Sequence, residues 1–217
     1  MIRVTLPLPP AHYKADVKDP GEAFIRAVPR PTAEQWDSHR FWQLIHQDLY
    51  DGLKGICCYC ASWSPRRSRG DDHTSIDHFI PKGKVPGLAY AWSNFRLCRE
   101  RLNNRKKGHF DVLDPCGIQN DVFVIDFATF RVEPRGTLPQ QVARRVTETI
   151  ERLGLNSDRD YVNERSRIVR AYSLDQITAN YVNERYPFIG QQMASQNFDA
   201  NFKAKWRAFF LRTNIRP

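Results

Sequence analysis

Hydrophobic positions follow a helical period from Thr32 onward. Thr32 and Gln35 form a T-x-x-Q pattern, a capping box that satisfies backbone N–H groups in the first turn of a helix. Apolar residues then recur at helical spacing, so we predict one amphipathic helix over residues 32–53, ending near Gly52 and Gly55. Its apolar positions are Trp36, Phe41, Leu44, Ile45, Leu49 and Leu53. Six prolines in residues 1–31 predict mostly extended, irregular chain before this helix, because proline fixes φ and lacks a backbone donor.

The C-terminal half predicts a short β segment and three helices. Alternating apolar residues over 122–127 predict a strand or hairpin. From Pro139 the period is helical, with a first helix ending at Gly154, a second starting at the S-x-x-D pattern of Ser157, and an aromatic last helix. We interpret the three apolar stripes as core-facing surfaces rather than base-stacking platforms. They comprise Val142, Val146, Ile150 and Leu153; Tyr161, Ile168, Tyr172, Ile177 and Tyr181; and Phe198, Phe202, Trp206, Phe209 and Phe210.

Composition is that of an ordinary globular protein. The 217 residues are 41% hydrophobic and 26% charged, which argues against global disorder. No apolar run approaches the roughly 18–20 residues of a membrane span, and residues 1–10 lack the apolar core of a signal peptide. We expect a soluble, cytoplasmic protein without a membrane partner, folded as one domain or as one domain with a small insert.

Positive charge is concentrated in one quarter of the chain. The formal charge is +9, and residues 54–107 hold twelve Lys/Arg and four Asp/Glu, which is 12 − 4 = +8 of that total. Such a field attracts polyanions, of which nucleic acid is the commonest. The alternative is a solvated loop region with surplus arginine. Arg66, Arg67 and Arg69 form a basic run that fits either interpretation.

The five cysteines do not indicate a disulfide framework, because their number is odd and the chain lacks a secretion signal. Three of them, Cys57, Cys58 and Cys60, lie within four residues. This spacing indicates metal binding or simple packing.

The residues most suited to catalysis surround the adjacent pair Asp77-His78. Asn94 follows His78 by 16 residues, and Asn104 follows Asn94 by 10. A histidine with a pKa near neutrality can take a proton from water, while carboxylate and amide oxygens are hard ligands suited to Mg²⁺ or Mn²⁺. Adjacent side chains point to opposite faces of a regular strand, so a bend or bulge is expected if both serve one site.

The order of these motifs resembles the HNH, or ββα-metal, nucleases. The motifs are C-x-x-C at 57–60, D-H-F-x-P-K at 77–82, W-S-N at 92–94, the adjacent Leu-Cys pair at 97–98, and N-x-x-K-G at 104–108. An L-D-P block at 113–115 and an L-G-L-N segment at 153–156 resemble the PtuB-like branch found in Septu and retron-associated bacterial defence systems. The resemblance covers roughly residues 56–170.

The resemblance implies a role for each matching residue. His78 matches the general base, Asp77 the metal-binding acid beside it, and Asn94 the central asparagine that buttresses the loop. Asn104 matches the distal ligand of the catalytic Mg²⁺ or Mn²⁺, with Asn103 as its rival. Basic residues near the motif are expected to bind nucleic acid: Lys82, Lys84, Arg105, Lys106 and Lys107.

A structural zinc site is a further expectation. Many HNH proteins carry a second C-x-x-C, but here position 101 is arginine. Cys57, Cys60 and Cys98 supply three of the four ligands that Zn²⁺ needs. The fourth ligand is left open among His73, His109, Cys58 and Cys116. Otherwise the thiols pack as small apolar groups.

We therefore predict an α+β protein in which a small ββα-metal HNH nuclease module lies within a mostly helical scaffold. The expected regions are 1–55, an extended segment and helix; 56–116, the nuclease module; and 117–217, a short β segment and C-terminal helices. The resemblance implies a metal-dependent endonuclease, with DNA as the preferred substrate, acting in antiphage defence with a PtuA-like ABC-type ATPase. The alternatives are an RNA- or tRNA-cleaving nuclease, a nonenzymatic nucleic-acid-binding zinc-knuckle module, and a protein-interaction subunit with an inactive site.

Overall fold

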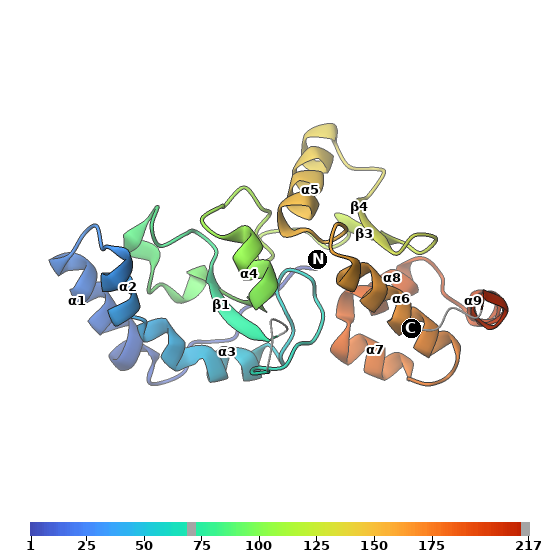
Figure 1. Cartoon of the computed structure of the whole chain (residues 1–217), viewed down its shortest axis with the longest axis horizontal. Coiled ribbons are helices and arrows are strands. Elements are labelled where there is room, and N and C mark those ends of the chain that lie inside the picture. Colours follow the sequence, from blue (N-terminus) through green and yellow to red (C-terminus); the bar gives the residue numbers. More distant parts are fainter. Residues whose placement is uncertain (69–72, 214–217) are drawn as a thin grey trace.

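A computed structural model describes residues 1–68 and 73–213 of the chain. The protein mixes helices with two small antiparallel sheets within this described part, which is compatible with the predicted α+β class. It is elongated, with α1 to α3 at one end, β1 and α4 in the middle, and α6 to α9 at the other end (Figure 1). Arg69, which belongs to the basic run, lies outside the described residues.

The N-terminal segment is helical, so the prediction of extended chain over 1–31 was wrong in part. A π-helical turn, η1 (Lys14–Lys18), leads into α1 (Asp19–Ala27). Pro20 lies in the first turn of α1, directly after the wider π-helical turn, where it removes one backbone donor from the continuous helical stretch. Val17 and Phe24 are buried and attach this segment to the core.

The predicted capping box is confirmed, but the single helix after it was wrong. The backbone N–H of Gln35 donates to Thr32 Oγ1 at 3.4 Å, and the Thr32 N–H donates to Gln35 Oε1 at 2.8 Å. The chain then divides into α2 (Ala33–Ser38), a 3₁₀ turn η2 (Phe41–Ile45) and α3 (His46–Gly52). The tighter 3₁₀ turn shifts the side-chain register, so Trp42 is buried while Leu44 is 58% exposed.

The middle of the molecule is a two-stranded sheet followed directly by a helix. Strand β1 (Thr74–His78) pairs antiparallel with β2 (Phe95–Arg99), and α4 (Glu100–Lys106) begins where β2 ends. The connection between the strands contains two short 3₁₀ turns, η3 (Pro86–Leu88) and η4 (Trp92–Asn94). Register is regular to the end, with Asp77 opposite Arg96 and His78 opposite Phe95.

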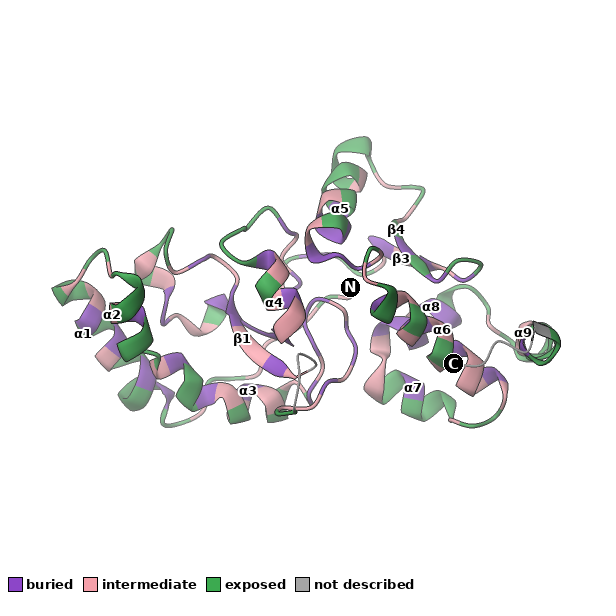
Figure 2. Ribbon diagram, viewed as in Figure 1, coloured by how far each residue is buried: buried purple, intermediate pink, exposed green. Residues whose placement is uncertain are grey.

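Strand β2 is buried along its whole length because it contributes to two hydrophobic cores. Figure 2 shows buried positions (purple) toward both ends of the molecule, among them positions on α1 and α7. Phe95 and Leu97 pack with the N-terminal helices, whereas Cys98 packs with the core of the C-terminal half. Successive side chains of a strand point to opposite faces, so one short strand joins both cores. This arrangement holds β1 and α4 between the two ends of the molecule.

The C-terminal half largely follows the predicted pattern. Strands β3 (Phe123–Asp126) and β4 (Arg131–Pro134) form an antiparallel pair, and α5 (Gln140–Leu153) ends at Gly154 in the left-handed conformation. The N-cap of α6 (Arg159–Ser173) is Asp158 rather than Ser157. The predicted second helix, expected to run to Pro187, is interrupted at Asp175, where φ is positive, and continues as α7 (Ala179–Arg185). A further helix, α8 (Pro187–Ser195), was not predicted. The aromatic last helix is α9 (Ala200–Thr213). None of the helices in the described ranges is long and apolar enough to cross a membrane.

Candidate functional site

A cleft of about 1180 Å³ runs beside β1 and α4 and is lined by several of the residues singled out from the sequence, although not by Asn94. Asp77, His78, Asn103 and Asn104 all line it. Among the described residues its lining is predominantly basic, with six Lys/Arg and three Asp/Glu: Arg40, Arg66, Arg67, Lys82, Lys84 and Lys107 against Asp37, Asp77 and Glu100. A cleft with this balance of charges favours anionic ligands.

A hydrogen bond from one ring nitrogen fixes the orientation of the His78 imidazole. It ends β1, and its Nε2 lies 2.8 Å from the carbonyl oxygen of Ala89. A carbonyl only accepts hydrogen bonds, so Nε2 carries the hydrogen and Nδ1 keeps a lone pair. The ring packs edge-on against Trp42 and Phe95, with centroid distances of 4.7 and 5.5 Å.

The electrostatic environment keeps His78 uncharged. Burial, with a smaller contribution from the Lys82 ammonium, lowers the pKa of His78 to about 3. The imidazole is therefore neutral at physiological pH and has a lone pair that can accept a proton. This is the protonation state that a general base requires.

Asn94 clamps the loop that follows His78. Its Oδ1 accepts from the Ile80 N–H at 2.7 Å, and its Nδ2 donates to the carbonyl oxygens of Ile80 and Leu88 at 2.9 and 3.0 Å. The clamped loop ends next to Ala89, the residue that fixes the His78 ring. The side chain thus has the buttressing arrangement that the resemblance implies.

Asp77 is buried and already neutralised by a cation of the chain. Tyr59 donates its hydroxyl to Asp77 Oδ2 at 2.6 Å, and Lys106 Nζ lies 3.1 Å from both carboxylate oxygens. Lys106 also donates to the His78 carbonyl oxygen at 3.0 Å. Burial raises the pKa of Asp77, and Lys106 and Tyr59 partly offset this effect.

The regular register of β1 excludes the expected bulge at Asp77-His78. The two side chains follow the alternation of a strand, with Asp77 hydrogen-bonded to Tyr59 and Lys106, and His78 packed against Trp42. Both nevertheless line the cleft. Two neighbouring functional groups can therefore reach one cleft from a strand end without distortion of the ladder.

Asn103, rather than Asn104, is the asparagine of α4 that faces β1. Its Nδ2 donates to Ser75 Oγ at 2.9 Å and to the Ile76 carbonyl oxygen at 3.4 Å, whereas Asn104 is exposed on the cleft wall. A Mg²⁺ or Mn²⁺ ion does not fit on Asp77 in this arrangement, because Tyr59 and Lys106 use about three of the four acceptor directions of the carboxylate. Within residues 1–68 and 73–213, no three His, Cys, Asp or Glu side chains form a group that could hold a metal ion.

The predicted nucleic-acid contacts separate into two groups. Lys82, Lys84 and Lys107 line the cleft. The Lys82 ammonium lies 5.7 and 5.3 Å from the ring centroids of Trp36 and Trp42, and the Lys84 ammonium lies 4.5 Å from that of Phe110. These contacts hold two cations at the cleft rim.

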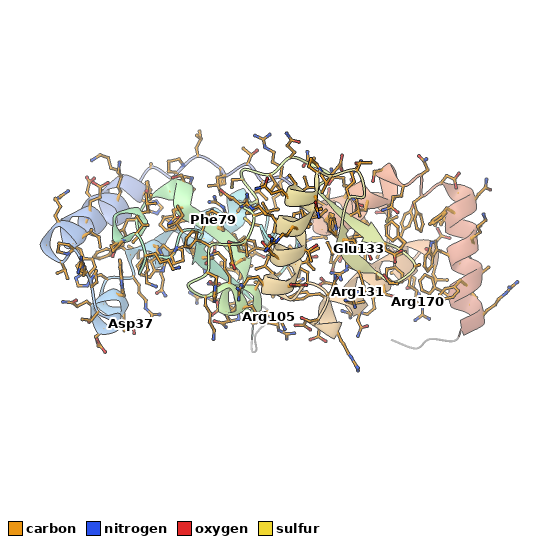
Figure 3. All side chains as sticks on the ribbon, turned by 90° about the horizontal axis from the view of Figure 1, so that it is seen from above. Asp37, Phe79, Arg105, Arg131, Glu133 and Arg170 are labelled. Atoms are coloured by element: carbon orange, nitrogen blue, oxygen red, sulfur yellow. The ribbon has the colours of Figure 1, made fainter. Side chains whose placement is uncertain are left out.

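Arg105 and Lys106, which were predicted to bind nucleic acid, are not among the residues that line the cleft. Arg105, which is labelled in Figure 3, contacts the segment that follows α5, where it donates to the Gly154 carbonyl at 3.1 Å and pairs with Asp158 at 3.0 Å. Lys106 is 0% exposed and paired with Asp77. Both side chains are paired with carboxylates of the chain, and neither is among the residues that line the cleft.

The cysteines do not form the expected zinc site. Cys57 and Cys98 pack in the C-terminal core and Cys58 packs in the N-terminal one. Cys57 Sγ accepts from the Arg99 N–H at 3.4 Å, and Cys98 Sγ lies 3.8 Å from Ser75 Oγ. Burial raises the pKa of the Cys60 and Cys98 thiols. A structural Zn²⁺ needs about four ligands, and within the described residues no group of three His, Cys, Asp or Glu side chains could hold a metal ion.

Sequence reasoning missed part of the cleft wall. Arg40 and His46 come from the segment interpreted only as an amphipathic helix, and His46 Nε2 lies 3.1 Å from Thr74 Oγ1. Burial, with Arg66 and Arg67, lowers the pKa of His46 to about 4. Arg66 and Arg67 were visible as a basic run, but only the fold shows that they line the same cleft as residues of α4.

A scan of protein-family models and a search of curated proteins give no match to this chain.

Proposed function

We propose that this protein is a nuclease that hydrolyses phosphodiester bonds of nucleic acid in the basic cleft. The observation that carries the proposal is His78, a neutral imidazole with Nε2 bound to the Ala89 carbonyl and Nδ1 left as an acceptor. It lies in a cleft whose lining carries six basic side chains. A base and a set of phosphate-binding cations are two of the requirements for hydrolysis of a phosphodiester.

The proposed mechanism uses His78 Nδ1 as the general base. A water molecule loses its proton to Nδ1 as its oxygen attacks phosphorus, and the P–O bond to the sugar oxygen breaks. The sugar oxygen leaves as an alkoxide and takes a proton from solvent water. The phosphate charge itself raises the pKa of His78 from its low value in the free protein, so the imidazole becomes a stronger base when substrate is bound. Lys82, Lys84 and Lys107 neutralise the negative charge of the bound strand.

The order β1–β2–α4 around His78 supports the HNH, or ββα-metal, assignment as part of this proposal. We further propose DNA as the preferred substrate and a PtuB-like role as a cytoplasmic antiphage effector with a PtuA-like ATPase partner; these rest on the sequence resemblance. The arrangement at Asp77 and at the cysteines does not fit the metals that the resemblance implies, so no step of the mechanism is routed through them.

A substrate panel tests the proposal. Purified protein is incubated with plasmid DNA, single-stranded DNA, structured RNA and tRNA, each with Mg²⁺, with Mn²⁺ and with EDTA. We expect cleavage of DNA by the wild type and by His12→Ala, which alters a histidine outside the cleft lining, but not by His78→Ala. Selective cleavage of tRNA would show that the substrate is tRNA and not DNA.

A nonenzymatic nucleic-acid-binding protein is the second candidate. The ion pair between Asp77 and Lys106 favours it, because the acid expected to serve catalysis is occupied. This candidate predicts salt-sensitive binding of DNA or RNA with no strand cleavage under any of the conditions of the panel.

A further inference from the structure

The cation nearest to Asp77 is part of the chain itself. The Lys106 side chain is completely buried, and its Nζ lies 3.1 Å from Asp77 Oδ1, 3.1 Å from Oδ2 and 3.0 Å from the His78 carbonyl oxygen. An ammonium group has three N–H donors, and three oxygen acceptors surround it here. The ammonium is therefore fully coordinated within the protein.

We propose that the Lys106 ammonium fills the cation site of Asp77 and excludes a divalent metal ion from it. Asp77 then has a lysine, not Mg²⁺ or Mn²⁺, as its charge partner. This inference concerns the protein without nucleic acid and does not rest on the proposed function.

Electrostatics favours this assignment. A divalent ion bound to either Asp77 oxygen would lie within a few ångströms of the Lys106 ammonium, and like charges at that distance repel strongly inside a protein. Tyr59, which donates to Asp77 Oδ2 at 2.6 Å, occupies a further acceptor direction. A metal ion would have to displace at least one of these two donors.

The Lys106 ammonium is enclosed by the protein in its position beside Asp77. Its nitrogen lies 5.8 Å from the ring centroid of Phe79, inside the protein, and a lysine buried without a counterion is strongly disfavoured. Lys106 is also the last residue of α4, where the helix dipole favours a cation. The helix end, the carboxylate and the His78 carbonyl thus hold the ammonium together.

The test is Mn²⁺ binding to the full chain without nucleic acid, followed by electron paramagnetic resonance. The proteins are the wild type, Asp77→Asn, Lys106→Met and the double variant Lys106→Met/Asp77→Asn. Lys107→Met, which removes an exposed neighbouring charge, is the matched control for a general change in surface potential. If Lys106→Met does not fold by circular dichroism, Lys106→Gln, which keeps a donor but no charge, replaces it.

We expect the wild type and Asp77→Asn to bind Mn²⁺ equally, and Lys106→Met to gain a site that the double variant lacks. Removing one like charge a few ångströms away should strengthen binding at that site by at least ~10-fold, while Lys107→Met should have a much smaller effect. A wild-type Mn²⁺ site that is lost in Asp77→Asn would overturn the proposal. So would a Lys106 variant that folds but gains no Asp77-dependent site.

Discussion

The ammonium nitrogen of Lys106 lies 3.1 Å from each carboxylate oxygen of Asp77, with both side chains buried. Removing one partner leaves an unpaired buried charge, so we expect Lys106→Met to lower the free energy of unfolding by about 3–5 kcal/mol. The double variant Lys106→Met/Asp77→Asn should lose less than the sum of the two single variants, because it contains neither charge. Urea denaturation of the four proteins measures this coupling.

Additive losses in that cycle would contradict the ion pair, because independent sites give independent free-energy changes. Exposed pairs provide the contrast. Arg144 and Glu148 on α5 form an i,i+4 pair with side chains 80% and 44% exposed, and Arg144→Met should change stability by no more than about 0.5 kcal/mol.

Asn94 should be essential for the stability of the loop beside His78. Asn94→Ala removes three part-buried hydrogen bonds and leaves the backbone groups of Ile80 and Leu88 without that partner. We expect a loss of roughly 2–4 kcal/mol in the free energy of unfolding. The exposed Asn104→Ala variant serves as control and should lie within about 0.5 kcal/mol of the wild type. Equal stability of the two variants would show that Asn94 is not a clamp.

Stability should fall as the pH is lowered from neutral. The pKa of His78 is about 3 in the folded protein, below the value of about 6.5 for unfolded histidine, so the unfolded chain binds more protons between these two values. The contribution of neutral His78 to the free energy of unfolding is fully present above about pH 6.5. It is lost as the pH falls toward 3, at up to about 1.4 kcal/mol per pH unit. His46, with a pKa of about 4, acts in the same direction.

Chemical denaturation between pH 8 and pH 4 measures this dependence. His78→Gln should flatten the curve relative to the wild type, since glutamine does not titrate. A curve of unchanged slope in this variant would mean that His78 is not held neutral by the fold.

Nucleic-acid binding should depend on salt through the cleft-lining cations. Arg66→Gln and Lys84→Gln should each reduce the slope of log K against log salt by up to about 0.9 on duplex DNA. Arg144→Gln, outside the cleft lining, is the matched control and should leave the slope unchanged. Fluorescence anisotropy over a range of salt concentrations gives these slopes. Equal effects of all three variants would indicate diffuse binding rather than binding in the cleft.

Local signals in the sequence predicted local structure well. The Thr32–Gln35 capping box, the strand pair near 122–134 and the helix stop at Gly154 all depend on neighbouring residues. The break between α2 and α3 could not be predicted in this way, because it places Trp42 against His78 from a distant strand. Tertiary packing decides that register.

The candidate site was predicted only as far as its residue types allow. The sequence identified Asp77, His78 and Asn94, but it could not show which basic residues face the cleft. Lys106 and Arg105 are adjacent on α4 but contact different parts of the protein. Lys106 pairs with Asp77 of β1, and Arg105 pairs with Asp158. A helix directs neighbouring side chains to different faces, so charge alone does not locate a phosphate contact.

The initial rate of DNA strand cleavage by His78→Ala, relative to the wild type and to His12→Ala, tests the central claim most directly. We expect wild-type protein and His12→Ala to cleave at similar rates, and His78→Ala to be slower by at least ~100-fold, the usual effect of losing a general base. Circular dichroism and binding of the same DNA establish that the variant is folded and still loads substrate. Cleavage by folded, substrate-binding His78→Ala at the wild-type rate would contradict the assignment of His78 as the base.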